Sequence, residues 1–121
     1  MKILVVDDSK AMRMIVVRTL RQAGFSGHDV VEAENGKEGF ELTQSLKPDL
    51  VLSDWNMPEM TGIELLKALR ASGDATPFCF VTSEGSEEMR AMADQAGALG
   101  LIARPFTAEA FADTLGSVVA S

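Results

Sequence analysis

The sequence predicts an α/β fold in which a parallel sheet carries helices on both faces. Short apolar runs alternate along the whole chain with segments of helical periodicity, which is the pattern of βαβ units. The chain has 121 residues, enough for one hydrophobic core and too few for two. It contains no internal repeat, low-complexity tract or linker. We therefore expect residues 1–121 to form one doubly wound (βα)5 domain.

Five short runs, rich in apolar and β-branched residues, predict the strands. The first, Ile3–Val6, is followed directly by two aspartates, and the third, Leu50–Ser53, is followed by another. Carboxylates at the carboxyl ends of parallel strands lie in the crevice where open α/β sheets bind ligands. The other three strands are expected at Asp29–Ala33, Phe78–Thr82 and Gly100–Ala103.

Helical periodicity fills the segments between these strands. The first helix is predicted by a stripe with the i, i+3, i+4, i+7 spacing, and Gly24 supplies its stop signal. Its members are Met12, Ile15, Val16, Thr19, Leu20 and Ala23. A weaker pattern after the Asn35–Gly36 turn signal predicts a helix at Lys37–Leu46. Three further stripes are Gly62, Leu65, Leu66 and Leu69, then Met89, Met92, Ala93 and Ala96, then Ala108, Phe111, Ala112 and Leu115; Gly73 and Gly97 end the first two.

Composition excludes several function classes. The net charge of −7 disfavours direct contact with nucleic acid and with anionic membrane surfaces. No apolar stretch has the length of a membrane span. The content of 46% hydrophobic and 24% charged residues is that of an ordinary globular domain, for which we expect a cytoplasmic location.

Four residues of types that often have functional roles are given structural interpretations in this sequence. The single cysteine, Cys79, cannot form an internal disulfide and is expected to be a buried packing thiol. His28 has no cysteine or second histidine to share a metal and is expected in a loop or on the surface. Met89 and Met92 are expected to pack in the core.

The strand ends predict an acidic cluster. Asp7, Asp8 and Asp54 converge on one spot if the strands Ile3–Val6 and Leu50–Ser53 are neighbours in the sheet. Such a cluster is costly unless a cation occupies it, and oxygen ligands without histidine or cysteine suit Mg²⁺. The alternative for Asp7 and Asp8 is a solvated turn, with Ser9 as a good helix cap.

Four motifs at the ends of strands one, three, four and five together resemble the CheY-like receiver domain of bacterial two-component response regulators. They are Asp7–Asp8, the loop from Asp54 to Gly62, Thr82–Ser83, and Arg104–Pro105–Phe106. The resemblance spans essentially the whole chain. It implies a flavodoxin-like fold with the strand order 2-1-3-4-5.

The resemblance also implies roles for the site residues. Asp54 would accept a phosphoryl group. Asp8, Asp54 and the backbone carbonyl of Asn56 would ligate Mg²⁺, and Asp7 would act through metal-bound water. The Thr82 hydroxyl would donate to a phosphoryl oxygen; the alternative is a strand-end threonine that satisfies local backbone. Backbone N–H groups of Trp55 and Ser83 would add donors, and Asn56 and Glu84 would tune the loss of the phosphoryl group.

Two departures from the family pattern concern the response to phosphorylation. Arg104 stands where the family has lysine, and its planar fork is not an equivalent replacement. It could contact the phosphoryl group bidentately, or point outward and pair with a surface carboxylate. Leu101 stands where family members have a tyrosine or phenylalanine that rotates inward. The resemblance further implies a cis bond between Arg104 and Pro105.

The function implied by the resemblance is a phosphorylation switch. A sensor histidine kinase, or a small phosphodonor, would modify Asp54, and a downstream protein would bind through the fourth helix, fifth strand and fifth helix of a monomer. One alternative is an interaction module that needs no phosphate, which Mg²⁺ binding would discriminate. A phosphatase with an aspartyl-phosphate intermediate needs a second carboxylate where Asn56 stands. A flavodoxin-type carrier is disfavoured because Asp7 and Asp8 would repel the flavin phosphate.

Overall fold

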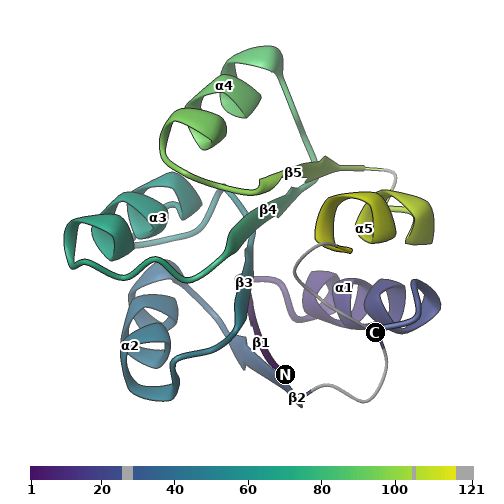
Figure 1. The fold of residues 1–121 in the computed structure, drawn as a ribbon, viewed down its shortest axis with the longest axis horizontal. Coiled ribbons are helices and arrows are strands. Elements are labelled where there is room, and N and C mark those ends of the chain that lie inside the picture. The colour runs from purple at the N-terminus through teal and green to yellow at the C-terminus, as the bar shows by residue number, and fades with distance from the viewer. Residues whose placement is uncertain (26–28, 105, 117–121) are drawn as a thin grey trace.

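The computed structural model describes residues 1–25, 29–104 and 106–116, and its fold is shown in Figure 1. The predictions for His28 and for the peptide bond between Arg104 and Pro105 fall outside these residues. The strands are β1 (Lys2–Val6), β2 (Asp29–Ala33), β3 (Leu50–Ser53), β4 (Phe78–Thr82) and β5 (Gly100–Ala103). They form one parallel sheet in the order β2-β1-β3-β4-β5, which confirms the predicted fold class and strand order.

A helix follows each strand, and each helix begins at a side-chain cap. The helices are α1 (Lys10–Gln22), α2 (Gly36–Leu46), α3 (Gly62–Ala71), α4 (Glu87–Gln95) and α5 (Ala108–Leu115). In each cap, the side-chain oxygen accepts a hydrogen bond from the backbone N–H of the residue three positions later. The capping residues are Ser9, Asn35, Thr61, Ser86 and Thr107. Such caps satisfy amides that the helix itself leaves unpaired. Among the described residues no helix is long and apolar enough to cross a bilayer.

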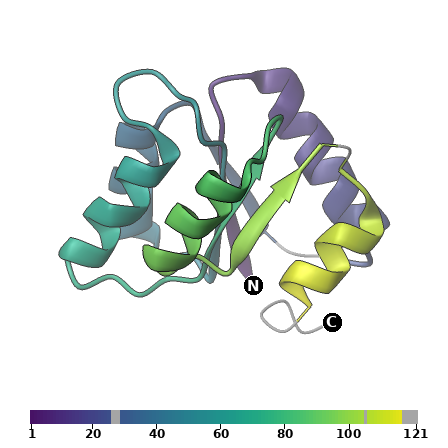
Figure 2. The ribbon, with the colours of Figure 1, turned by 90° about the horizontal axis from the view of Figure 1, so that it is seen from above.

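Helices cover both faces of the sheet. In Figure 1, α2 and α3 lie on one side of the strands and α1 and α5 on the other, and Figure 2 shows the same layers from above. Alternate residues of β1 supply the two cores: Leu4 and Val6 join the cluster under α2, α3 and α4, whereas Ile3 and Val5 join the cluster under α1 and α5. This alternation is the period-two pattern of a strand buried on both faces.

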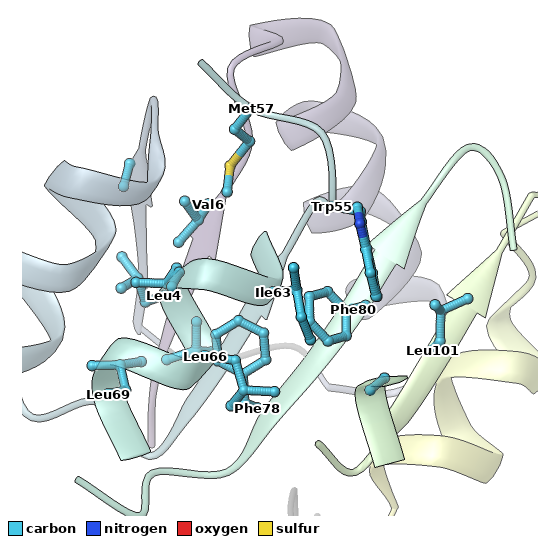
Figure 3. Close-up of a cluster of buried hydrophobic side chains, with 14 residues drawn as sticks. Leu4, Val6, Trp55, Met57, Ile63, Leu66, Leu69, Phe78, Phe80 and Leu101 are labelled. Carbon is cyan, nitrogen blue, oxygen red and sulfur yellow. The ribbon is translucent and has the colours of Figure 1, made fainter. Parts of the chain in front are cut away.

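Aromatic side chains in the first of these cores hold the loop that follows β3. The rings of Trp55 and Phe80 lie 4.7 Å apart between centroids, and those of Phe78 and Phe80 lie 5.1 Å apart. Figure 3 shows Trp55 above Phe80, with Leu101 in the same cluster. Because Trp55 directly follows Asp54, this packing anchors the backbone on which Asp54 stands.

Two positions on the predicted helical stripes are corrected by the structure. Met92 is 42% exposed, so the prediction that it packs in the core is wrong, whereas Met89 does pack against the core. The reason is that α4 sits beside β5 at the sheet edge and buries only Ala93 fully. On α1, Ile15 is 37% exposed, and Arg13 is buried instead. Cys79 is fully buried, as predicted.

Candidate functional site

Three carboxylates meet at the carboxyl edge of the sheet. β1 and β3 are hydrogen-bonded neighbours in which Val6 pairs with Ser53. The ladder continues past both strands, because Asp7 N–H donates to Ala33 O at 3.0 Å and Asp54 N–H donates to Val6 O at 2.9 Å. Oxygen atoms of Asp7, Asp8 and Asp54 consequently all lie within 4.8 Å of one another. The predicted acidic cluster is therefore formed.

Backbone amides orient two of these carboxylates. Ser9 N–H donates to Asp7 Oδ1 at 2.8 Å, and Trp55 N–H donates to Asp54 Oδ1 at 2.8 Å. Asp7 is buried, Asp54 is partly buried and Asp8 is exposed. The site thus opens to solvent on the side of Asp8. The capping role foreseen for Ser9 is present as well, so the turn is both a helix start and part of the acidic cluster.

The pKa values of Asp7 and Asp54 show what it costs to bury carboxylates at this site. Burial raises the pKa of Asp7 from 3.8 to about 6; the nearby charges of Asp54 and Asp8 add to this, while Ser9 N–H and Arg13 act in the opposite direction. Burial also raises the pKa of Asp54, against the hydrogen bonds from Trp55 N–H and the Thr82 hydroxyl. A bound cation would offset both costs. An all-oxygen donor set of this kind fits Mg²⁺.

The loop after β3 is folded back so tightly that it requires glycine where α3 begins. A Cβ atom on Gly62 would lie 2.1 Å from Asp54 O and 2.9 Å from Phe80 Cε1. Gly62 N–H donates to Trp55 O at 2.8 Å, and the Ser53 hydroxyl donates to Asp54 O at 2.9 Å. These contacts fix the backbone of Asp54 from both sides.

Thr82 lies at the end of β4, beside Asp54. It is fully buried, and its hydroxyl holds the pKa of Asp54 down. The same oxygen accepts Glu84 N–H at 3.4 Å. Thr82 therefore serves the local backbone and faces the acidic cluster at once. Ser83 and Glu84 are exposed in the loop that follows.

Asn56 and Arg104 contribute backbone groups near the site, whereas their side chains are exposed. The Asn56 side chain is exposed, and its backbone N–H stabilises the ionised form of Asp54. Arg104 N–H donates to Thr82 O at 3.2 Å, which places its backbone beside β4. Its side chain is exposed and makes no ion pair with any carboxylate in the described ranges, so the outward pairing considered from the sequence is not formed there.

Sequence reasoning missed Arg13. The residue stands on α1 and is 7% exposed; its Nη1 donates to Asp7 O at 2.6 Å and its Nε donates to Glu32 Oε1 at 2.8 Å. A signal was present, because Arg13 precedes Val16 by three residues and Leu20 by seven, on the apolar stripe of the helix. A cation at such a position needs a buried partner.

Comparisons with known proteins agree with this arrangement. The family model of the response regulator receiver domain matches residues 3–115. The chemotaxis protein CheY homolog of Campylobacter jejuni is 41% identical, over 98% of this chain and 92% of its own. The structure of chemotaxis protein CheY4 of Vibrio cholerae is 38% identical, with a TM-score of 0.82 over 97% of both chains. The receiver domain of the putative response regulator NarL from Mycobacterium tuberculosis is 28% identical, with a TM-score of 0.83 over 96% of this chain and 93% of that one.

Proposed function

Because the chain belongs to the response regulator receiver family and is of the CheY type, we propose that it is switched by phosphorylation of Asp54. A sensor histidine kinase or a small phosphodonor supplies the phosphoryl group. The observation that carries the proposal is the convergence of Asp7, Asp8 and Asp54 at the carboxyl edge of the sheet, with Thr82 beside them. Two carboxylates with raised pKa values in one cluster support a functional site at this edge of the sheet.

In the proposed transfer, an oxygen of Asp54 attacks phosphorus in line with the leaving group. The new P–O bond forms as the P–N bond of a kinase phosphohistidine breaks, and the histidine nitrogen keeps the electron pair. Asp8, Asp54 and the carbonyl of Asn56 would hold Mg²⁺, with Asp7 acting through metal-bound water. The ion would supply charge neutralisation for the phosphoryl oxygens.

After transfer, the remaining site residues hold the product. The Thr82 hydroxyl donates to a phosphoryl oxygen, and N–H groups of Trp55 and Ser83 add further donors. Arg104 supplies a fixed positive charge from the end of β5. Asn56 and Glu84 tune the rate at which water removes the phosphoryl group, so that the receiver assists both its own phosphorylation and its own dephosphorylation.

The signal is a shift between two conformations of the loops after β3 and β4 and of α4. Moving such a switch from 1:99 to 99:1 requires about 5.5 kcal/mol of differential stabilisation. We assign the docking of a downstream protein to the face formed by α4, β5 and α5 of a monomer in the cytoplasm. The chemotaxis relatives make a single-domain regulator of chemotaxis type the leading form of this proposal.

Phosphorylation by a small donor tests the proposal directly. Incubate the chain with acetyl phosphate and Mg²⁺, and measure the intact mass and the site by peptide mapping. We expect one phosphoryl group on Asp54, none on Asp54→Asn, and none after the metal is chelated. A chain that binds Mg²⁺ but is never modified by any donor would favour the alternative, a receiver-like interaction module that needs no phosphorylation.

Mg²⁺ binding should change the emission of Trp55, the only tryptophan. The indole of Trp55 packs on Phe80, and the backbone N–H of Trp55 donates to Asp54 Oδ1, so a ligand that pulls on Asp54 moves the fluorophore. We expect a saturable change in the millimolar range or below, weakened at least about tenfold in Asp8→Asn, which removes an exposed ligand. An unchanged titration in Asp8→Asn would place the binding elsewhere.

A further inference from the structure

The guanidinium of Arg13 is a buried charge for which the proposed function has no use. Arg13 is 7% exposed, and its guanidinium contacts the backbone of the first aspartate of the acidic cluster. One nitrogen donates to Asp7 O at 2.6 Å and another donates to Glu32 Oε1 at 2.8 Å. A cation placed there for charge alone would hinder the binding of a second cation. Its geometry therefore indicates a different purpose.

The oxygen that Arg13 binds belongs to the peptide unit between Asp7 and Asp8. A peptide unit is planar, so holding its oxygen fixes the plane from which both Cα atoms and both carboxylates project. The flanking amides are also held, because Asp7 N–H donates to Ala33 O at 3.0 Å and Ser9 N–H donates to Asp7 Oδ1 at 2.8 Å. Among the hydrogen bonds of the described residues, that of Arg13 acts directly on the peptide unit shared by the two aspartates.

Glu32 supplies the anchor on the other side. It stands on β2, and its partner in the sheet register is Val5, two residues before Asp7. Its side chain is half exposed, whereas that of Arg13 is buried. The bridge from β2 through Arg13 to the Asp7 carbonyl thus ties the β1–α1 turn to the edge of the sheet. Charge-assisted bonds of this kind are short and directional.

We propose that Arg13 is a positioning residue that orients Asp7 and Asp8 for a divalent cation, through its hydrogen bond to the Asp7 carbonyl. The inference rests on the proposed function of the acidic cluster. Groups that orient metal ligands from behind typically change metal affinity by 10- to 100-fold when they are removed. We therefore expect Arg13→Gln to weaken Mg²⁺ binding about tenfold.

The direction of the effect separates positioning from electrostatics. Removing a positive charge near a cation site should by itself tighten binding, because the repulsion disappears. Weaker binding in Arg13→Gln, opposite in direction to this loss of repulsion, is the result expected from lost orientation. Arg18→Gln is the matched control, since Arg18 is exposed on the same helix and carries the same charge. Arg13→Lys keeps the charge but not the fork, and should recover part of the affinity.

The experiment is a Mg²⁺ titration of the metal-free protein, followed through Trp55 emission and repeated by calorimetry, for the parent and each variant. We expect an affinity loss of about tenfold in Arg13→Gln, a smaller loss in Arg13→Lys, and none in Arg18→Gln. Binding in Arg13→Gln that equals or exceeds that of the parent would overturn the inference. A parent that binds no Mg²⁺ would overturn the metal site itself, a distinguishable result.

A second variant keeps the test decisive if Arg13→Gln does not fold. Glu32→Ala releases the guanidinium from β2 while leaving the buried arginine in place, and Glu34→Ala removes an equal charge from an exposed position nearby. We expect Glu32→Ala to weaken Mg²⁺ binding several-fold more than Glu34→Ala does. Equal losses in the two variants would show that only charge matters, which would contradict a positioning role.

Discussion

Burial of the ionised Asp7 side chain, which the proposed site needs, costs the folded protein stability. The residue is 3% exposed, its carboxylate lies close to those of Asp8 and Asp54, and its pKa is raised to about 6. A carboxylate with a raised pKa in the folded state binds protons more tightly there than in the unfolded chain. Stability therefore falls as the pH rises from about 4 to about 6, and the full cost of ionised Asp7 is present above that range.

Replacing Asp7 with asparagine should stabilise the metal-free protein at neutral pH. A shift of this size, reduced because the cluster is open to solvent beside Asp8, corresponds to about 1–2 kcal/mol. We expect Asp7→Asn to exceed the parent by that amount in urea unfolding at pH 7.5 with chelator, and the gain to shrink towards pH 4. Saturating Mg²⁺ should narrow the difference by stabilising the parent. An Asp7→Asn variant less stable than the parent at pH 7.5 would show that the ionised Asp7 does not destabilise the metal-free protein.

At the scale of single residues, the sequence predicted those site residues that stand at the end of a strand or directly after it. Asp7, Asp8, Asp54 and Thr82 all follow or end an apolar run, and parallel strands bring such ends to one edge. Arg13 was not predicted, because its partners are a backbone carbonyl and a residue 19 positions away. Contacts of that range depend on the pairing of β1 with β2, which the pattern of a single helix does not contain.

At the scale of elements, the junction between β3 and α3 is tightly constrained. The start of α3 touches the carbonyl of Asp54 so closely that a Cβ atom at Gly62 would overlap it, at 2.1 Å. The sequence indicated a glycine that opens a helix, but not this contact. The capping box of Thr61 and Glu64 fixes where the helix begins, so the chain has little freedom to move away.

Gly62→Ala should therefore destabilise the protein and disturb the site together. We expect a loss of about 3 kcal/mol in the free energy of unfolding, at the upper end for overpacking, because the obstacle is backbone. The control is Gly73→Ala, whose Cβ atom would meet nothing within 4 Å and whose cost of about 1 kcal/mol comes from its φ of +86°. Urea unfolding measures both, and equal losses would contradict the steric argument.

The helices show which features hydrophobic periodicity can predict. The periodicity located all five helices correctly, because each carries an apolar stripe and a cap. It misjudged Met92 and Ile15, which lie on the stripe but remain exposed. The burial of a stripe depends on how much sheet lies beneath it, and α4 sits at the edge beside β5. That information comes from the strand order, which periodicity alone does not provide.

At the scale of the whole molecule, a continuous set of contacts joins the acidic cluster to the α4–β5 edge. Thr82 faces Asp54 and accepts Glu84 N–H, and the next residue, Gly85, packs on β5. A Cβ atom at Gly85 would lie 2.9 Å from both Leu101 Cδ2 and Ala103 Cβ. Arg90 of α4 donates from Nη1 to Leu101 O at 2.9 Å. These contacts give a movement of the loop after β4 a direct path to β5.

This arrangement affects how phosphorylation can be read out. Leu101 is already only 6% exposed and has no ring to bury, so an inward rotation of this side chain would bury little further apolar surface. The loop that carries Gly85 and the hydrogen bond from Arg90 remain as the connection to α4. We expect the response to depend on what pulls that loop towards the phosphoryl group, which leaves Thr82 and the charge of Arg104.

The Arg104 side chain is exposed and makes no ion pair with the carboxylates of the described residues, so its charge is available. Its backbone N–H donates to Thr82 O, which couples it to the strand beside the acidic cluster. We expect Arg104→Ala to be phosphorylated on Asp54 by a small donor, because transfer depends on the acidic cluster. It should nevertheless lose most of the shift in α4, since no cation at the end of β5 holds the product oxygens.

Amide chemical shifts of α4, recorded with and without a phosphoryl mimic, would measure that loss. Arg104→Lys should retain a good part of the shift, because it restores the charge without the planar fork. The parent and Thr82→Ala bracket the range, since Thr82 is the other group expected to hold the phosphoryl oxygens. If Arg104→Ala responds as fully as the parent, the charge at the end of β5 has no part in the switch. The response must then pass through Thr82 and the metal alone.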